Sequence, residues 1–268
     1  MTNIIDSHTH IFPEDLAKKA VNSICDFYGF PRKFGQKGTI TNLKEKSSEA
    51  GVKYLIINST ATTPAQVETI NNWIASNISN TVFGLGTIHP DYPDIEKEIE
   101  RIRTLGLKGI KLHPDFQQFY ADDRKLDRIY ACAQGVLPIL IHSGDKRYDF
   151  SAPKRIANIL YRFPKLDIVA AHLGGYSRWD EVKKYLLGRR LWFDTSSSLW
   201  YMENEEAIEI IRKHGTDKIL FGTDYPLADY KKELIKFYEL GLSKKEQEDI
   251  FFNNTNELYK LNITGDVK

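Results

Sequence analysis

Histidine and aspartate side chains follow four of the apolar runs in this 268-residue chain. Two histidines, His8 and His10, follow the first run, and residues two apart in an extended chain lie on the same face. Single residues follow three later runs, namely His142, His172 and Asp224. Imidazole and carboxylate groups together suit zinc and also accept iron, manganese or nickel. These residue types therefore predict a metal site if the fold brings the ends of the runs together.

The His-x-His pair alone is weak evidence for such a site, because pairs of this kind often occur by chance. For any single residue, the alternative is a histidine that ends a strand and satisfies nearby backbone groups. Four of the seven histidines and one aspartate nevertheless share the same kind of position. The set favours one common site over five unrelated strand ends.

Eight short apolar runs alternate with longer amphipathic stretches, and this alternation predicts a parallel α/β fold. Strands are expected at residues 4–5, 52–57, 82–88, 109–112, 138–141, 167–171, 191–193 and 219–221. Helices are expected at residues 64–75, 95–105, 123–133, 153–163, 177–187, 203–213 and 230–240. An open doubly wound sheet fits this alternation too. Polar residues after many different strands favour a closed (β/α)8 TIM barrel, which gathers its active site at the C-terminal rim of the strands.

The expected barrel forms one domain over residues 1–268, close to the roughly 250 residues typical of this fold. The interval between the first two strands is longer than the others. It holds two helical patterns, at residues 14–27 and 40–50. We interpret residues 13–50, approximately, as a helical insertion after strand one.

Several segments together resemble the amidohydrolase superfamily and, within it, the amidohydrolase 2 branch, which includes aminocarboxymuconate-semialdehyde decarboxylase. The segments are IIDSHTHIFPEDL, GIKLHPDF, PILIHSG, IVAAHLGG, LFGTDYP and DIFFNNTNELYKL, and they span residues 4 to about 261. The resemblance implies a barrel with a metal at its C-terminal rim. It assigns four metal ligands: His8, His10, His142 and Asp224. It also implies that His172 handles the reacting water, and Asp224 is expected to share that proton transfer.

Lys111 and His113 lie in and just after the fourth predicted strand. Charged residues in central strands are rare without a role, so we expect Lys111 to face the barrel centre as a cation for a substrate carboxylate. The resemblance offers another role, since binuclear members carry a carbamylated lysine that bridges two metals. The expected cofactor is a divalent metal, zinc before others, with one ion per chain or two if Lys111 is carbamylated. His113 either lines the pocket or caps its strand.

The expected function is that of a metal-dependent hydrolase that activates a bound water against a small, carboxylate-bearing substrate. A non-oxidative decarboxylase is the first alternative, because the resemblance implies the same metal-water core for both. A non-catalytic metal-binding protein is the second. Arg147 follows the fifth strand and is a candidate for the substrate carboxylate, against the alternative of a solvated loop. No Gly-x-Gly-x-x-Gly follows the first strand, which excludes a Rossmann-type oxidoreductase.

The balance of charge argues against a nucleic-acid or membrane-surface partner, since 37 Lys and Arg face 36 Asp and Glu. No apolar stretch is long enough for a transmembrane helix, and Asp6 and His8 interrupt any signal peptide at the start. Both cysteines, Cys25 and Cys132, are expected to be reduced. We therefore expect a cytoplasmic protein whose partner is a small-molecule substrate. The sequence also allows the protein to form a homo-oligomer.

Overall fold

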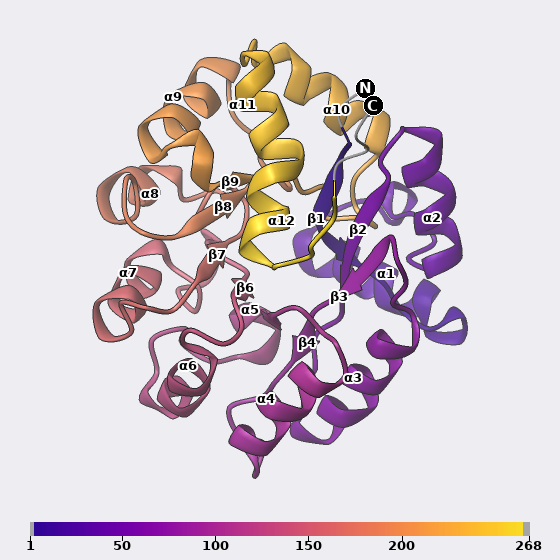
Figure 1. Ribbon diagram of the computed structural model, residues 1–268, viewed down its shortest axis with the longest axis vertical. Coiled ribbons are helices and arrows are strands. Elements are labelled where there is room, and N and C mark those ends of the chain that lie inside the picture. Colours follow the sequence, from indigo (N-terminus) through magenta and orange to yellow (C-terminus); the bar gives the residue numbers. More distant parts are fainter. Residues whose placement is uncertain (1–2, 265–268) are drawn as a thin grey trace.

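The computed structural model describes residues 3–264, in which parallel strands alternate with helices around a ring (Figure 1). The strands are β1 (Ile5–His10), β2 (Tyr54–Asn58), β3 (Val82–Gly84), β4 (Gly86–Thr87), β5 (Ile110–Leu112), β6 (Ile139–Ile141), β7 (Ile168–Ala170), β8 (Trp192–Asp194) and β9 (Ile219–Leu220). The α-helices are α1 (Glu14–Tyr28), α2 (Ile40–Glu49), α3 (Val67–Ser76), α4 (Ile95–Thr104), α5 (Pro114–Gln117), α6 (Asp127–Ala133), α7 (Pro153–Arg162), α8 (Trp179–Tyr185), α9 (Asn204–His214), α10 (Tyr230–Glu239), α11 (Lys244–Glu248) and α12 (Asn254–Leu258).

Backbone hydrogen bonds join the strands into a closed ring. Strands β1, β2 and β3 pair in that order, as do β4 to β9, and every pair is parallel. The pieces β3 and β4 form the strand expected at residues 82–88, interrupted at Leu85, whose amide donates to the Ile57 carbonyl over 2.9 Å. Between β9 and β1, the Ser7 amide donates to the Phe221 carbonyl over 2.8 Å. The predicted (β/α)8 barrel is confirmed.

The inside of the barrel is filled by apolar side chains near the ends where the strands begin. This inner cluster includes Ile5, Ile56, Leu85, Leu140, Val169 and Leu220. The C-terminal segment closes that end, and Figure 1 shows α12 crossing the centre of the ring. Tyr259, which follows α12, packs so closely that a Cβ on Gly109 would lie 3.1 Å from its ring and 2.7 Å from the Pro138 carbonyl oxygen. Glycine is therefore required at residue 109.

Some element boundaries differ from those expected. Strand β1 extends beyond the apolar run at residues 4–5 to His10, so both histidines belong to the end of the strand, as the sequence predicts. Helix α8 begins at Trp179 instead of residue 177. The short helix α5 was not expected; Pro114 opens it, and the His113 side chain caps it by accepting from the Phe116 amide.

The two expected helical segments between β1 and β2 are present as α1 and α2. Both cysteines are free thiols, Cys25 buried and Cys132 half-buried. Within residues 3–264, every helix is too short or too polar to cross a bilayer.

Candidate metal centre

A polar layer lies directly above the inner apolar cluster of the barrel. Leu140 belongs to that cluster, and His142 lies two residues further along the same strand direction. Lys111 likewise lies two residues beyond Gly109, and Asp194 ends β8. Because residues two apart in a strand share a face, these side chains enter the barrel interior near its C-terminal rim. Each of the three polar side chains is almost completely buried.

Three potential metal ligands converge at this rim. The two imidazole Nε2 atoms of His8 and His10 lie 3.1 Å apart. Asp224 Oδ1 lies 3.2 Å from the Nε2 atom of His10 and 3.6 Å from that of His8. The other carboxylate oxygen, Oδ2, accepts a hydrogen bond from Ser197 Oγ over 2.7 Å. One carboxylate oxygen is thus anchored, and the other faces the two histidines.

Asp194 fixes the orientation of His8 from behind. Its Oδ2 atom lies 3.0 Å from His8 Nδ1, and a carboxylate can only accept, so His8 donates from Nδ1. The lone pair of His8 is therefore on Nε2, the atom that faces His10 and Asp224. Metal-binding histidines commonly have such a carboxylate partner on the second ring nitrogen, which sets the tautomer. Ser196 Oγ also lies 3.0 Å from His8 Nδ1.

His172 is held beside the same aspartate. Its backbone amide donates to Asp194 Oδ1 over 3.1 Å, and its Nδ1 lies 3.0 Å from the Ser196 carbonyl oxygen. The Nε2 atom lies 2.9 Å from Nδ1 of His142. His172 has a φ of 63°, in the left-handed region that a non-glycine residue adopts only at a cost. The surrounding hydrogen bonds hold the imidazole in place despite that cost.

His142, His113 and Asp115 form a second group on the other side of His172. His142 Nε2 lies 3.7 Å from Asp115 Oδ2. Neither His142 Nε2 nor Asp115 Oδ1 has a hydrogen-bond partner among the described residues. The His113 ring stacks on the His142 ring, with centroids 4.1 Å apart, and its Nε2 lies 3.2 Å from the Tyr28 hydroxyl. Both nitrogens of His113 are engaged, because Nδ1 accepts from Phe116.

Burial sets the protonation of these groups. Desolvation lowers the pKa of His8 to about 4, with a further contribution from Lys111, and it lowers the pKa of His142 well below its ordinary value. Burial alone would raise the pKa of Asp194, but the adjacent His8 brings it down to about 2. The hydrogen bond to His10 and nearby histidines likewise hold the pKa of Asp224 well below its usual range. Neutral imidazoles beside ionised carboxylates are the protonation states that metal binding requires.

Lys111 faces the barrel centre, as its place in a central strand predicts. Its Nζ atom lies 2.8 Å from His8 Nε2, and its side chain is completely buried. Burial lowers the pKa of Lys111 to about 8, although Asp224 and Asp194 oppose the shift. One lone pair on His8 cannot serve both Lys111 and a metal ion, so metal binding would release this hydrogen bond.

The residues present fit a divalent cation. Ligand atoms bonded to one ion at about 2.0–2.2 Å lie roughly 3 Å apart, and the spacing of His8, His10 and Asp224 matches that requirement. The set contains two nitrogens and one carboxylate oxygen, which suits zinc and other first-row metals. The unpartnered Nε2 atom of His142 is a buried polar atom of the kind that a ligand would satisfy.

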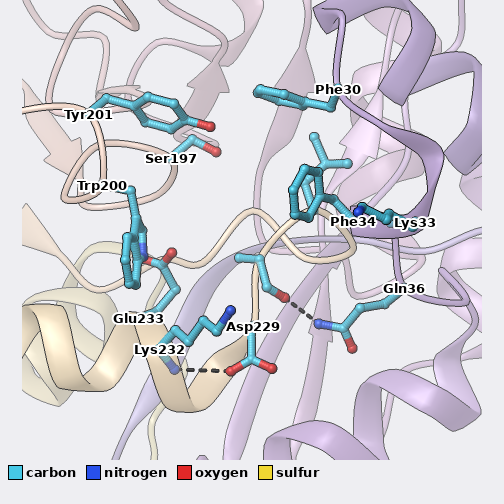
Figure 2. A pocket seen from close by; sticks show the side chains of 13 residues that line it. Phe30, Lys33, Phe34, Gln36, Ser197, Trp200, Tyr201, Asp229, Lys232 and Glu233 are labelled. Atoms are coloured by element: carbon cyan, nitrogen blue, oxygen red, sulfur yellow. Dashed lines mark hydrogen bonds between the residues drawn. The ribbon is translucent and has the colours of Figure 1, made fainter.

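Aromatic side chains from the insertion and from the segment after β5 cover the site. Tyr28, at the end of α1, and Phe116, in α5, line the space next to the histidines. This space is small, about 20 Å³. A chamber of about 550 Å³ lies alongside and shares Leu227 with that space (Figure 2). A second space of about 340 Å³ borders the histidines at His10 and Phe116. Any molecule larger than a few atoms must therefore extend into the chamber or into this second space.

Arg147 lies apart from the histidine cluster. Its guanidinium pairs with Asp145, with 2.6 Å between Nη2 and Oδ2, and it packs over the rings of Phe27 and Tyr28. It lines neither the small space nor the chamber. In this arrangement Arg147 braces α1 against the loop after β6.

Sequence reasoning missed two carboxylates that shape the site. Asp194 ends a predicted strand in the same way as the five residues that were found, so the same criterion applied to strand seven would have identified it. Asp115 lies two residues after His113 in a short helix, where no strand pattern points to it. Tyr28 was also missed, because nothing in the sequence of α1 indicates which of its residues reach the barrel mouth.

Comparison with known proteins places this geometry in a family. The amidohydrolase family profile matches residues 5–261. The fold is similar to that of 5-carboxyvanillate decarboxylase from Sphingomonas paucimobilis, with a TM-score of 0.77 and 16% identity over 97% of this chain and 99% of that one. It is also similar to 2,6-dihydroxybenzoate decarboxylase from Rhizobium, with a TM-score of 0.74 and 14% identity over 98% and 100% of the two chains.

A dihydroxybenzoic acid decarboxylase from a Polaromonas species, solved with bound manganese and the inhibitor 2-nitroresorcinol, matches with a TM-score of 0.75 and 16% identity over 98% of each chain. A search of curated protein sequences finds no significant match. At these identities the structural matches establish the fold, and the family match covers nearly the whole chain. The protein therefore belongs to the amidohydrolase family of enzymes, in its amidohydrolase 2 branch.

Proposed function

We propose that this enzyme is a metal-dependent decarboxylase, which removes carbon dioxide from a small hydroxylated aromatic acid. The observation that carries the proposal is the buried group of His8, His10 and Asp224 beneath aromatic walls formed by Tyr28 and Phe116. Three solved structures with a similar fold belong to enzymes named as decarboxylases of aromatic acids. This choice takes the sequence-based alternative, decarboxylation, in preference to the hydrolysis that was expected first.

We infer that His8, His10 and Asp224 hold the cation. His142, the fourth ligand expected from the sequence, has a free Nε2 atom, but this atom lies 3.7 Å from Asp115 Oδ2 in the second group, so the imidazole must turn to join the other three ligands. A divalent cation bound there would act as a Lewis acid toward the substrate carboxylate. Zinc was expected from the residue types, whereas one neighbouring structure holds manganese, and the donor set accepts either ion. Full occupancy with one ion per chain is the simplest stoichiometry; carbamylation of Lys111 would allow two.

The protein groups have separate tasks in the proposed reaction. When the bond to the carboxylate breaks, its electron pair remains on the ring carbon and must be taken up by a proton. Asp224 stays ionised in the free enzyme, so His172 is the better group to hold and deliver this proton. Lys111, buried at the rim, supplies positive charge toward an acidic substrate. Tyr28 and Phe116 exclude bulk water and present flat faces to an aromatic ring.

Hydrolysis is the second candidate, and a specific observation favours it. The space beside the histidines measures about 20 Å³, which is enough for one water molecule. A water held there between neutral histidines and Asp224 would be placed for attack on a carbonyl carbon. For decarboxylation, Tyr28 or Leu227 must shift so that a carboxylate group enters the same space.

The test is an assay that measures both reactions on the same preparations. Purified enzyme, metal-stripped enzyme and samples reconstituted with zinc or manganese are incubated with 2,6-dihydroxybenzoate, 2-hydroxybenzoate and a set of carboxylate-bearing lactones and amides. We expect metal-dependent release of carbon dioxide from at least one aromatic acid. Turnover of the lactones or amides alone would favour hydrolysis, and equal turnover without metal would contradict both candidates.

A further inference from the structure

The chamber beside the metal centre has its own polar group. Ser197 and Leu227 line both the chamber and the space around Asp224, so the two are neighbours. Because the space at the histidines is small, the body of a substrate whose carboxylate reaches the metal centre extends into a neighbouring space, and the chamber, at about 550 Å³ against about 340 Å³, is the larger of the two. The residues that line the chamber therefore meet the part of the substrate that does not react.

Glu233 is the unusual residue of this chamber. It lies in α10 on the same face as the buried residues Tyr230, Leu234 and Phe237, where an apolar side chain is expected. The residue is 4% exposed, and its Oε2 atom has no hydrogen-bond partner among the described residues. Figure 2 shows its carboxyl group beside the Trp200 indole at the chamber wall. A buried oxygen without a partner costs free energy, so its retention needs an explanation.

The surroundings of Glu233 favour the neutral carboxyl group. Burial raises the pKa of Glu233 to about 8, partly offset by Trp200 and reinforced by Asp6, Asp224 and Asp229. A protonated carboxyl group both donates and accepts hydrogen bonds. Two lysines, Lys33 and Lys232, also line the chamber, and Figure 2 shows the Lys232 side chain reaching into it. Asp229 also lines the chamber, and the two lysines outnumber it, so the net positive charge disfavours an ammonium group on a ligand.

We propose that Glu233 determines substrate specificity by hydrogen-bonding a neutral hydroxyl or amide group on the part of the substrate remote from the reacting carboxylate. The Oε2 atom is out of contact with solvent, so the carboxyl group must turn away from the Trp200 indole for this oxygen to face the chamber, and the soft terminal torsion of a glutamate side chain permits that rotation. A ligand donor in the chamber then satisfies the oxygen that the protein leaves unpaired. The inference rests on the proposed function, which places the carboxylate at the metal centre.

A pair of isosteric probes tests this proposal. The probes are 2-hydroxy-4-(hydroxymethyl)benzoate and 4-ethyl-2-hydroxybenzoate, together with the same pair substituted at ring position 5. Isothermal titration calorimetry on the metal-loaded enzyme in the His172→Asn background, where turnover is expected to be slow, measures binding, and a parallel assay on the enzyme with His172 intact measures release of carbon dioxide. We expect the hydroxymethyl compound to bind at least about tenfold more tightly than its ethyl partner, because the ethyl group leaves Glu233 unpaired.

Three variants test whether the preference for the hydroxymethyl compound depends on Glu233. Glu233→Leu should abolish or reverse it, whereas Glu233→Gln should keep part of it, because an amide also donates and accepts. Glu239→Gln, at the exposed end of the same helix, should keep all of it. A purely structural Glu233 would change the thermal stability of these variants and leave the ratio of affinities near one in every protein.

The outcomes separate this inference from the proposed function. A hydroxymethyl preference without release of carbon dioxide supports the role of Glu233 and contradicts decarboxylation. Release of carbon dioxide from both probes with equal affinities supports decarboxylation and overturns the role of Glu233. Absence of binding by all four probes overturns the role of Glu233, and so does a preference that survives in Glu233→Leu.

Discussion

The barrel interior has two layers that come from the same strands and have opposite character. Leu140 and Val169 lie in the lower layer, which is apolar and closed off by the C-terminal segment. His142 and Asp194 lie in the upper layer, equally buried but polar. Burying apolar surface stabilises the fold, whereas burying polar groups with free lone pairs does not. The difference indicates that the upper layer is maintained for a ligand, and that changes in the two layers should have separable effects.

The largest expected effect follows from Asp224→Asn in the upper layer. A neutral amide is a poor ligand for a divalent cation, so metal affinity should fall by at least about 100-fold and turnover should fall with it. Elemental analysis after dialysis and the carbon dioxide assay measure the two effects. Asp217→Asn, at a residue exposed to solvent, is the matched control and should change neither. A fully metallated Asp224→Asn enzyme would show that Asp224 is no ligand.

His172→Asn should separate proton transfer from metal binding. If His172 delivers the proton, turnover should fall by about 10²- to 10⁴-fold, while metal content stays close to that of the wild type. The asparagine amide can still accept and donate within the hydrogen-bond network around Ser196. Steady-state kinetics and metal analysis of the same sample provide the comparison. An unchanged turnover number would assign His172 a structural role.

Asp194→Asn tests the support behind the ligands. Asp194 fixes the tautomer of His8 and holds the His172 backbone, so metal affinity should drop by about 10- to 100-fold. Competition with a chelator of known affinity measures the change. Asp167→Asn serves as the control. Asp167 directly precedes the first residue of β7, far from the rim, and pairs with Arg190 at the surface. Equal metal affinities in the two variants would mean that Asp194 contributes only to folding.

Leu140→Ala carries the smallest expected effect on the metal. It removes an apolar side chain from the lower layer and should lower the free energy of unfolding by about 2–5 kcal/mol. Metal content of the folded protein should stay the same, because no ligand is touched. Urea denaturation and metal analysis test this. Loss of metal at unchanged stability would contradict the separation of the layers.

The sequence was sufficient for the barrel because the physical signals were local and repeated. Each strand was an apolar run, and each βα unit repeated the pattern, so even the division of one strand at Leu85 did not disturb the topology. His8 and His10 lie beyond the apolar run at residues 4–5, and they belong to the end of β1, as the sequence predicts. Both histidines keep the extended conformation of the strand because the interior of the barrel is polar at its C-terminal rim.

Prediction of the site was less complete, for a different reason. His8, His10, His142, His172, Lys111 and Asp224 were expected at the rim, and the structure gathers all six around one small space. Arg147 was a candidate for binding the substrate carboxylate because it follows the fifth strand. In the structure it pairs with Asp145 instead, and this pairing depends on the path of the loop after β6, which the sequence does not reveal. Glu233 gave no signal, since a glutamate in an amphipathic helix usually faces solvent and only tertiary packing buries it.

The central claim is that one cation binds between His8, His10 and Asp224, and anomalous diffraction from crystals of the metal-loaded enzyme tests it most directly. We predict a single strong peak at the absorption edge of the bound metal, within bonding distance of the two Nε2 atoms and the Asp224 carboxylate. A peak held instead by His113, Asp115 and His142, or no peak at either group, would contradict the account.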